Sequence, residues 1–297
     1  MLFGKGILNP AQLRANSLVG TGIIGGLHPG KIPGLYPIES DPDAKAYINA
    51  VVAAGGTVSE GQRTAINTFY KTGKADGWYS SLKRLYLPIW GVAAPNAICM
   101  TSLTSGTFVG TVTHAAGYVQ SDGSTGYFNT GVSLSGAGCL QDSTSLFAMT
   151  RFNGALVNTQ RFMGGQDTSS NTRAWIERYG SGAGPNNGSS LSSATDTDNR
   201  YFFIRSRTGS AFRFNGRYRN GVYATRASDT AASQGIMTVQ NMVMMAINAN
   251  GVIQDYSNSG MDFCSYGFGL GFTEAQSELF GEATQNLWEG TTGLTLA

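Results

Sequence analysis

Glycine is the residue that most constrains how this chain can fold. It accounts for 41 of the 297 residues, about twice its ordinary share, and no three-residue repeat accompanies it, which excludes a collagen-like helix. Asn-Gly pairs at 215–216, 220–221 and 250–251 separate short runs of β-branched, aromatic and aliphatic residues. Both residues of such a pair tolerate the positive φ of a tight hairpin turn. This punctuation predicts a mainly β fold built from short antiparallel strands.

The predicted strands lie between residues 88 and 271. The clearest runs are residues 106–112, 145–150, 201–204 and 242–247. Two packed antiparallel sheets would bury such runs, so we expect a β-sandwich over residues 88–297. Residues 181–197 are rich in Gly, Asn and Ser and predict a long surface loop. A helix over 273–289, between an N-cap at Thr273 and a stop at Gly290, closes the chain.

Residues 41–87 have the punctuation of helices instead. The pair Asp41-Pro42 predicts a helix start, Ser59 predicts a second, and Gly73 ends that second helix. A third, short helix is expected from residue 76 to residue 86, because apolar residues recur there every three or four positions. The apolar residues of that third helix are Trp78, Leu82, Leu85 and Tyr86. We expect these three helices to form a small neck before the sandwich.

Residues 1–40 differ from the rest of the chain. They are rich in glycine and in isolated aliphatic residues, and no acidic residue precedes Glu39. An apolar arm left exposed would promote aggregation, so we expect an extended arm that docks into a groove on another subunit. The alternative is a disordered tail, although the arm is more apolar than typical disorder. The residues expected to dock are Leu2, Phe3, Ile7, Leu8, Ile23 and Ile24.

Charge and cysteine content exclude several classes of protein. The 20 Lys and Arg against 18 Asp and Glu give a formal net charge of +2, which does not favour a nucleic-acid partner. No apolar run approaches the about 20 residues of a membrane span, and Pro10 and Arg14 interrupt what would be the core of a signal peptide. We therefore expect no membrane insertion and synthesis in the cytoplasm. The three cysteines form no CxxC pair and are expected to be buried free thiols.

Catalytic and metal-binding patterns are sparse. Most acidic residues of the sandwich region stand beside Gly, Ser, Thr or Asn, as turn residues do, and His28 and His114 lie far apart with no GxSxG motif. The run from Asp196 to Asn199 lacks the spacing and the bidentate Glu of an EF-hand. The sequence predicts no enzymatic activity, no cofactor and no metal site.

Arginines are concentrated between residues 200 and 226, where they alternate with aromatic residues. Alternation by two places arginines and aromatics on opposite faces of a sheet. The candidate face for an anionic partner contains Arg205, Arg207, Arg213, Arg217 and Arg219. That partner would be a neighbouring subunit or an acidic glycan, and a solvated sheet face explains the pattern equally well.

Two further features bear on partners. No Lys or Arg occurs from residue 85 to residue 150, which suits either close packing in a homo-oligomer or two buried strands. Trp175 and Tyr179 lead into the polar loop, where Asn186 and Asn187 add amide groups. An aromatic platform flanked by amides is typical of a glycan site, while the alternative is that Trp175 belongs to the core.

Four segments, in this order along the chain, carry a resemblance to a known family. They are residues 41–91, which precede the sandwich as a helical module, DGSTGYFNTG at 122–131, RYRNGVY at 217–223, and GFGLGFTEAQSELF at 267–280. Together they resemble the concanavalin A-like, or laminin G-like, jelly-roll domains of bacteriophage virion proteins. The resemblance implies an antiparallel jelly-roll β-sandwich and a homotrimer on the virion surface. It is compatible with a tail-fibre or tail-tip adhesin that binds a host-surface glycan through its sandwich, or with a capsid decoration or head-fibre protein that has no ligand.

Overall fold

The computed structural model describes residues 40–151, 161–168, 173–177, 191, 198, 200–233, 237–257 and 260–296. Residues 40–297 form one compact unit. The predicted boundary between neck and sandwich, at residues 87 and 88, therefore falls inside a single unit. The arm residues Leu2, Phe3, Ile7, Leu8, Ile23 and Ile24 lie outside the described part of the chain, so their docking remains a prediction.

The larger sheet has eight strands. They are β1 (Leu82–Tyr86), β3 (Val112–Ala115), β4 (Tyr118–Ser121), β6 (Thr144–Thr150), β9 (Phe202–Gly209), β10 (Phe212–Arg219), β11 (Val222–Asp229) and β15 (Phe263–Gly269). Their order is β11-β10-β9-β6-β15-β4-β3, and β1 also pairs with β15. The central strand β6 is buried at all seven positions, so burial accounts for part of the stretch that lacks Lys and Arg.

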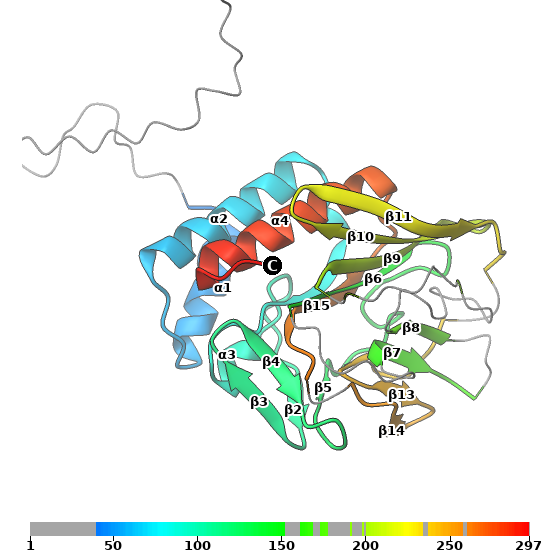
Figure 1. Cartoon of the computed structure of the whole chain (residues 1–297), viewed down its shortest axis with the longest axis horizontal. Helices are drawn as coiled ribbons and strands as arrows, with labels where there is room; N and C mark the ends of the chain where they lie inside the picture. The colour runs from blue at the N-terminus through cyan, green and yellow to red at the C-terminus, as the bar shows by residue number, and fades with distance from the viewer. Residues whose placement is uncertain are drawn as a thin grey trace, which may run out of the picture. The chain divides into compact units, whose positions relative to one another are not determined.

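The smaller sheet lies against one face of the larger one (Figure 1). Its strands are β2 (Thr107–Val109), β5 (Tyr127–Asn129), β7 (Arg161–Gln166), β8 (Arg173–Glu177), β12 (Val243–Met244), β13 (Ile247–Ala249) and β14 (Val252–Gln254). Their order is β14-β13-β7-β12-β5-β2, with β8 beside β7. Between the two sheets lies a core that includes Phe128, Phe162, Phe203, Phe263 and Tyr266. The predicted mainly β sandwich is confirmed.

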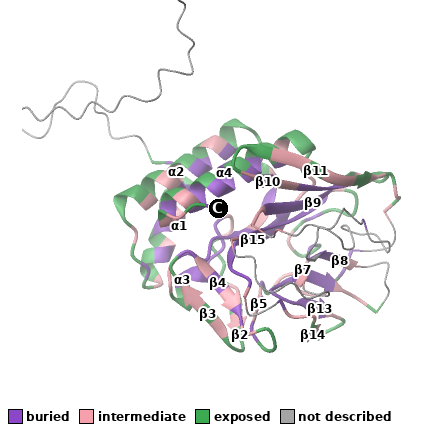
Figure 2. Ribbon diagram, in the orientation of Figure 1, coloured by how far each residue is buried: buried purple, intermediate pink, exposed green. Residues whose placement is uncertain are grey.

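Helices cover the other face of the larger sheet. They are α1 (Pro42–Ala53), α2 (Glu60–Ala75) and α4 (Glu274–Thr292), while the short α3 (Ala93–Asn96) and the 3-10 turn η2 (Tyr79–Ser81) lie in connections. Phe280 of α4 stacks edge-on against Phe147 of β6 and Phe202 of β9, with ring centroids 4.8 and 5.2 Å apart. Figure 2 shows buried stretches both on these helices and on the strands of the sheet. The expected neck therefore shares its hydrophobic core with the sandwich.

The predicted starts of α1, α2 and α4 are confirmed, but two of the predicted helix stops are wrong. Gly73 lies inside α2, which continues to Ala75 and has Asp76 as its C-cap. The Asp41 side chain accepts hydrogen bonds from the first backbone N–H groups of α1, and Ser59 and Thr273 each form a capping box with the glutamine three residues later. Gly290 does not end α4, because the helix continues to Gly293, whose φ of 70° closes it. A Cβ on Gly290 would lie 3.0 Å from the Cβ of Ala65, so this glycine permits the close approach of α4 to α2.

The predicted third helix is wrong. Residues 82–86 form strand β1, which pairs antiparallel with β15 so that Tyr86 lies opposite Tyr266. Leu82 and Leu85 are both buried, and their spacing of three fits a helix equally well. Pairing with a distant strand decided the conformation, which a local pattern does not reveal.

Turn signals proved partly correct. Asn220-Gly221 joins β10 to β11 and Asn250-Gly251 joins β13 to β14, and all four residues have positive φ. Asn215-Gly216 lies instead within β10, at a bulge in its pairing with β11, and the ring of Tyr223 fills the place of a Cβ on Gly216. The runs 106–112 and 242–247 are each split into two strands, by Gly110 and by Met245, both of positive φ.

Candidate functional site

Strands β9 and β10 carry different side chains on their two faces. Phe202, Phe214 and Tyr218 belong to the core beneath the helices. The opposite face carries Arg205, Arg207, Arg213, Arg217 and Arg219, which we call the arginine row. Arg205 lines a small buried space together with Phe203 and with Ile176 of β8, so the arginine row points toward the smaller sheet. The predicted separation of aromatics and arginines onto opposite faces is therefore present.

The inner part of the arginine row is closed off from solvent. Arg205, Arg207 and Arg213 are exposed by only 2%, 0% and 1%, so these three do not lie on an open surface. Arg213 donates two hydrogen bonds of 2.7 Å to the carboxylate of Asp229. Burial, reinforced by the neighbouring charges of Arg161 and Arg213, lowers the pKa of Arg205 to about 9. The inner row thus concentrates positive charge between the sheets.

The outer part of the row reaches solvent and forms a cluster with three preceding residues. Arg217 and Arg219 place their guanidinium carbons 4.3 and 4.2 Å from the centre of the Tyr201 ring. Arg219 also donates a 2.6 Å hydrogen bond to Asp198, and Arg200 binds both oxygens of the same carboxylate at 2.9 Å. We call these five residues the tyrosine–arginine cluster. The side chains of Arg200 and Arg219 are exposed by 37% and 25%.

Electrostatics keep the cluster positive at neutral pH. Partial burial would raise the pKa of Asp198, but hydrogen bonds from Arg200 and Arg219 outweigh it and hold that pKa well below its usual range. The same contact with Asp198 raises the pKa of Arg200. Arg200 and Arg219 therefore share the carboxylate of Asp198, and Arg217 and Arg219 lie over the Tyr201 ring. Such a group suits a carboxylate or phosphate ligand, because a guanidinium binds both in a planar, two-bond geometry.

Trp175 does not form an exposed platform. Its neighbours Ala174 and Ile176 enter the core between the sheets, while Trp175 packs on the other face of β8 with Ile247 and Ala249. The guanidinium carbons of two arginines of the same sheet, Arg161 and Arg173, lie 4.9 and 4.8 Å from its ring centre. The side chain is only 6% exposed, so a sugar has no access to its ring here.

The other glycan candidates, Tyr179, Asn186 and Asn187, lie outside the described residues. The grouping of these three residues with Trp175 therefore stays a prediction. The cluster also contains Asp198, Arg200 and Tyr201, which were not among the candidate residues from sequence; Asp198 was considered only as part of a run that lacks the pattern of a metal site.

The described carboxylates of the sandwich hold structural positions. Asp122 accepts hydrogen bonds from the backbone N–H groups of Ser124, Thr125 and Gly126, as expected of a turn residue. The carboxylate of Asp262 accepts a 2.9 Å hydrogen bond from Arg151. No three His, Cys, Asp or Glu side chains gather into a metal-binding group in the part of the chain that the structure describes. The cysteines, at 99, 139 and 264, are buried and free, as predicted. Among the described helices none has the length and apolar character of a membrane span.

Comparison with known proteins gives structural similarity only. No family model and no curated protein matches the chain. Domain 4 of AbnA, an extracellular arabinanase of Geobacillus stearothermophilus solved with arabinotriose, is similar at 12% identity, a TM-score of 0.43, 68% coverage of this chain and 98% of that domain. A Trypanosoma rangeli sialidase in complex with the inhibitor DANA is similar at 10% identity and a TM-score of 0.42, with coverages of 73% and 38%. An arabinofuranosidase complexed with arabinofuranosyl-alpha-1,2-xylobiose is similar at 12% identity and a TM-score of 0.38. The match covers 71% of this chain and 44% of the arabinofuranosidase.

These similar structures are carbohydrate-active proteins, and the chain spans less than half the length of the sialidase and the arabinofuranosidase. They correct one prediction. The sequence predicted no enzymatic activity, and that conclusion is wrong, because glycoside hydrolases stand among the structural neighbours of the chain. Identities of 10–12% and these TM-scores assign no catalytic residue to this chain. No virion protein is among the three, so the resemblance to phage proteins stays a prediction.

Proposed function

We propose that the β-sandwich binds an acidic glycan through the tyrosine–arginine cluster. The observation that carries this proposal is the stacking of two partly exposed guanidinium groups, those of Arg217 and Arg219, on the Tyr201 ring. Arginine supplies paired N–H donors to a carboxylate or phosphate, and the Tyr201 ring holds two of these guanidinium groups in place. The buried inner row adds positive potential behind the cluster, which favours an anionic ligand over a neutral one.

We further propose that the chain is a bacteriophage virion protein exposed as a tail fibre or tail-tip adhesin, with residues 1–40 as its anchor. This part rests on the resemblance of four segments to virion jelly-roll domains. Adhesion and glycan binding fit together, since a host surface offers acidic saccharides in repeated copies and an oligomer would bind several at once.

The binding proposal is tested with the full chain on a glycan array that includes sialylated, uronic-acid-containing, phosphorylated and neutral saccharides. Acidic saccharides should bind, and binding should weaken as salt rises. The double variant Arg217→Gln and Arg219→Gln should lose most of this binding, whereas Arg63→Gln, on the exposed surface of α2, should keep it. Thermal melting of each variant shows whether it is folded. Equal binding by the double variant and Arg63→Gln would overturn the proposed site.

The location is tested by gold labelling of intact virions with an antibody against the sandwich, viewed by electron microscopy. Label on the tail supports the adhesin. Label spread over the head would assign the chain to capsid decoration or a head fibre instead, and an absence of label on every particle would remove the virion assignment.

A further inference from the structure

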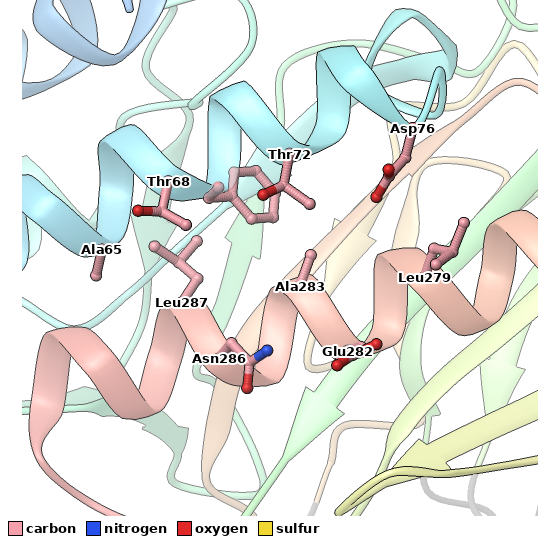
Figure 3. Close-up of a pocket in the computed structure, with 10 residues that line it drawn as sticks. Ala65, Thr68, Thr72, Asp76, Leu279, Glu282, Ala283, Asn286 and Leu287 are labelled. Atoms are coloured by element: carbon pink, nitrogen blue, oxygen red, sulfur yellow. The ribbon is translucent and has the colours of Figure 1, made fainter. Parts of the chain in front are cut away.

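An apolar groove runs between helices α2 and α4, on the outside of the helical layer. It has a volume of about 280 Å³, at the lower end of the about 300–1,000 Å³ typical of small-molecule pockets. Phe69 of α2 and Ala283 and Leu287 of α4 line it, and Leu279 at its edge is 40% exposed. Figure 3 shows Ala283 and Leu287 pointing across the groove toward the α2 side chains Thr68 and Thr72. An open groove of this size accepts a few apolar side chains of a peptide.

The charges around the groove have one sign. The two charged residues that line it, Asp76 and Glu282, are both acidic. The whole of α4 contains four glutamates and no Lys or Arg. An occupant of matching chemistry is therefore an apolar segment with basic residues and no acidic ones.

One segment of this chain has that composition. Residues 1–38 contain Lys5, Arg14 and Lys31, no Asp or Glu, and many isolated Ile and Leu side chains. A chain of this length has a maximum reach of about 130 Å, at about 3.4 Å per residue. It is long enough to reach a second molecule.

The start of α1 favours a second copy over the segment's own molecule. The backbone N–H of Asp41 donates to the side chain of Asn67 at 2.7 Å, and the carboxylate of Asp41 accepts from Lys74 at 2.8 Å. With about 3.6 residues per turn, Asn67 and Lys74 fall on the side of α2 opposite to Phe69 and Asp76. Asp41 is thus held on the side of α2 that lies opposite to the groove.

We propose that residues 1–38 of one copy bind in the α2–α4 groove of a second copy. The donor and acceptor surfaces differ, so the contact is head-to-tail and closes into a ring or continues as an open chain. The inference concerns assembly and does not depend on the proposed glycan binding.

The test measures the mass of the full chain in solution by sedimentation. The unmodified chain should be oligomeric. The double variant Leu279→Lys and Glu282→Lys places positive charge and removes apolar surface in the groove, and its mass should fall to that of one chain at the same concentration. Both residues are exposed, so the fold should tolerate the change. The control Val222→Lys with Glu60→Lys alters equally exposed residues elsewhere and should remain oligomeric.

A mixing experiment separates the remaining outcomes. A chain without residues 1–38 retains the compact unit of residues 40–297 and keeps its groove, whereas the groove variant keeps its arm. Each alone should be monomeric, and the mixture should form a heterodimer. An oligomer that survives the groove substitutions would overturn the proposal in favour of another interface. A monomeric unmodified chain would overturn it in favour of an arm bound to its own molecule or to another protein.

Discussion

The two faces of strands β9 and β10 are stabilised in different ways, although they share one backbone. On the helix side, Phe202 and Phe214 pack among aromatic rings, and non-directional burial does the stabilising. On the other side, Arg207 and Arg213 are almost fully buried and need partners of defined geometry. Arg207 donates hydrogen bonds to carbonyl oxygens, including that of Ala231 at 3.1 Å, and Arg213 donates to the carboxylate of Asp229. An apolar face tolerates small shifts, whereas a buried cationic face depends on each hydrogen bond.

The largest effect is expected from Phe280→Ala on the helix side. Phe280 is fully buried, and its ring contacts those of five other aromatic residues. These are Phe69, Trp78, Phe147, Phe202 and Phe272. Its removal should lower the free energy of unfolding by about 3–5 kcal/mol, measured by denaturant titration. Phe212→Ala is the control, because that ring is 39% exposed and its loss should cost less than about 1 kcal/mol. Similar losses for both variants would contradict the assignment of the core.

Arg213→Met tests the arginine side. This variant removes the partner of Asp229, whose side chain is 34% exposed and regains some hydration. We expect a loss of about 1–3 kcal/mol, less than for a fully buried pair. The double variant Arg213→Met with Asp229→Asn should lose less than the sum of the two single variants, because the two residues interact directly. Additive losses in this cycle would show that the ion pair contributes nothing, and that burial alone sets the cost on this face.

Gly73→Ala probes how closely the helical layer is packed. A Cβ on Gly73 would lie 2.6 Å from Cζ3 of the buried Trp78 indole, so either α2 or that ring must move. We expect a loss of about 1–3 kcal/mol. Gly61→Ala in the same helix meets nothing closer than 4.0 Å and should stabilise by up to about 1 kcal/mol through helix propensity. Thermal melting of the pair measures both, and a gain from Gly73→Ala would contradict the packing of Trp78.

The same comparison explains what the sequence could and could not predict. Local chemistry was sufficient for the caps at Asp41, Ser59 and Thr273, because a cap depends on residues within one turn. Alternation correctly separated arginines from aromatics, since the side-chain period of a strand is a local property. It did not reveal that the arginine side faces a second sheet, because what covers a face depends on distant segments. The helix predicted over residues 76–86 was wrong for the same reason, because β1 is set by its pairing with the distant strand β15.

One contact of the tyrosine–arginine cluster could have been predicted from the register of a β-hairpin. Phe202 lies opposite Tyr218 in the β9–β10 pairing, so the preceding residue, Tyr201, comes beside Arg219. A predicted hairpin centred near residue 210 would have given that neighbour from sequence. The position of Asp198 would not have followed, because it lies beyond the paired strand and its contact with Arg219 depends on the path of the chain before β9.

The smallest expected effect is a difference in pH dependence between the two faces. Hydrogen bonds from Arg213 hold the pKa of Asp229 below its usual range, so the unfolded chain binds a proton there more readily than the folded one. The contribution of this carboxylate is therefore complete above the unfolded pKa of about 3.9 and is lost as pH falls through the lower folded pKa. The unfolding free energies of the unmodified chain and Asp229→Asn should differ most above pH 5 and converge toward pH 2. Phe212→Ala changes no charge, so its unfolding free energy should differ from that of the unmodified chain by the same amount at every pH. A constant gap for Asp229→Asn would mean that Arg213 does not depend on the carboxylate charge, and the buried cation would then rest on its remaining hydrogen bonds alone.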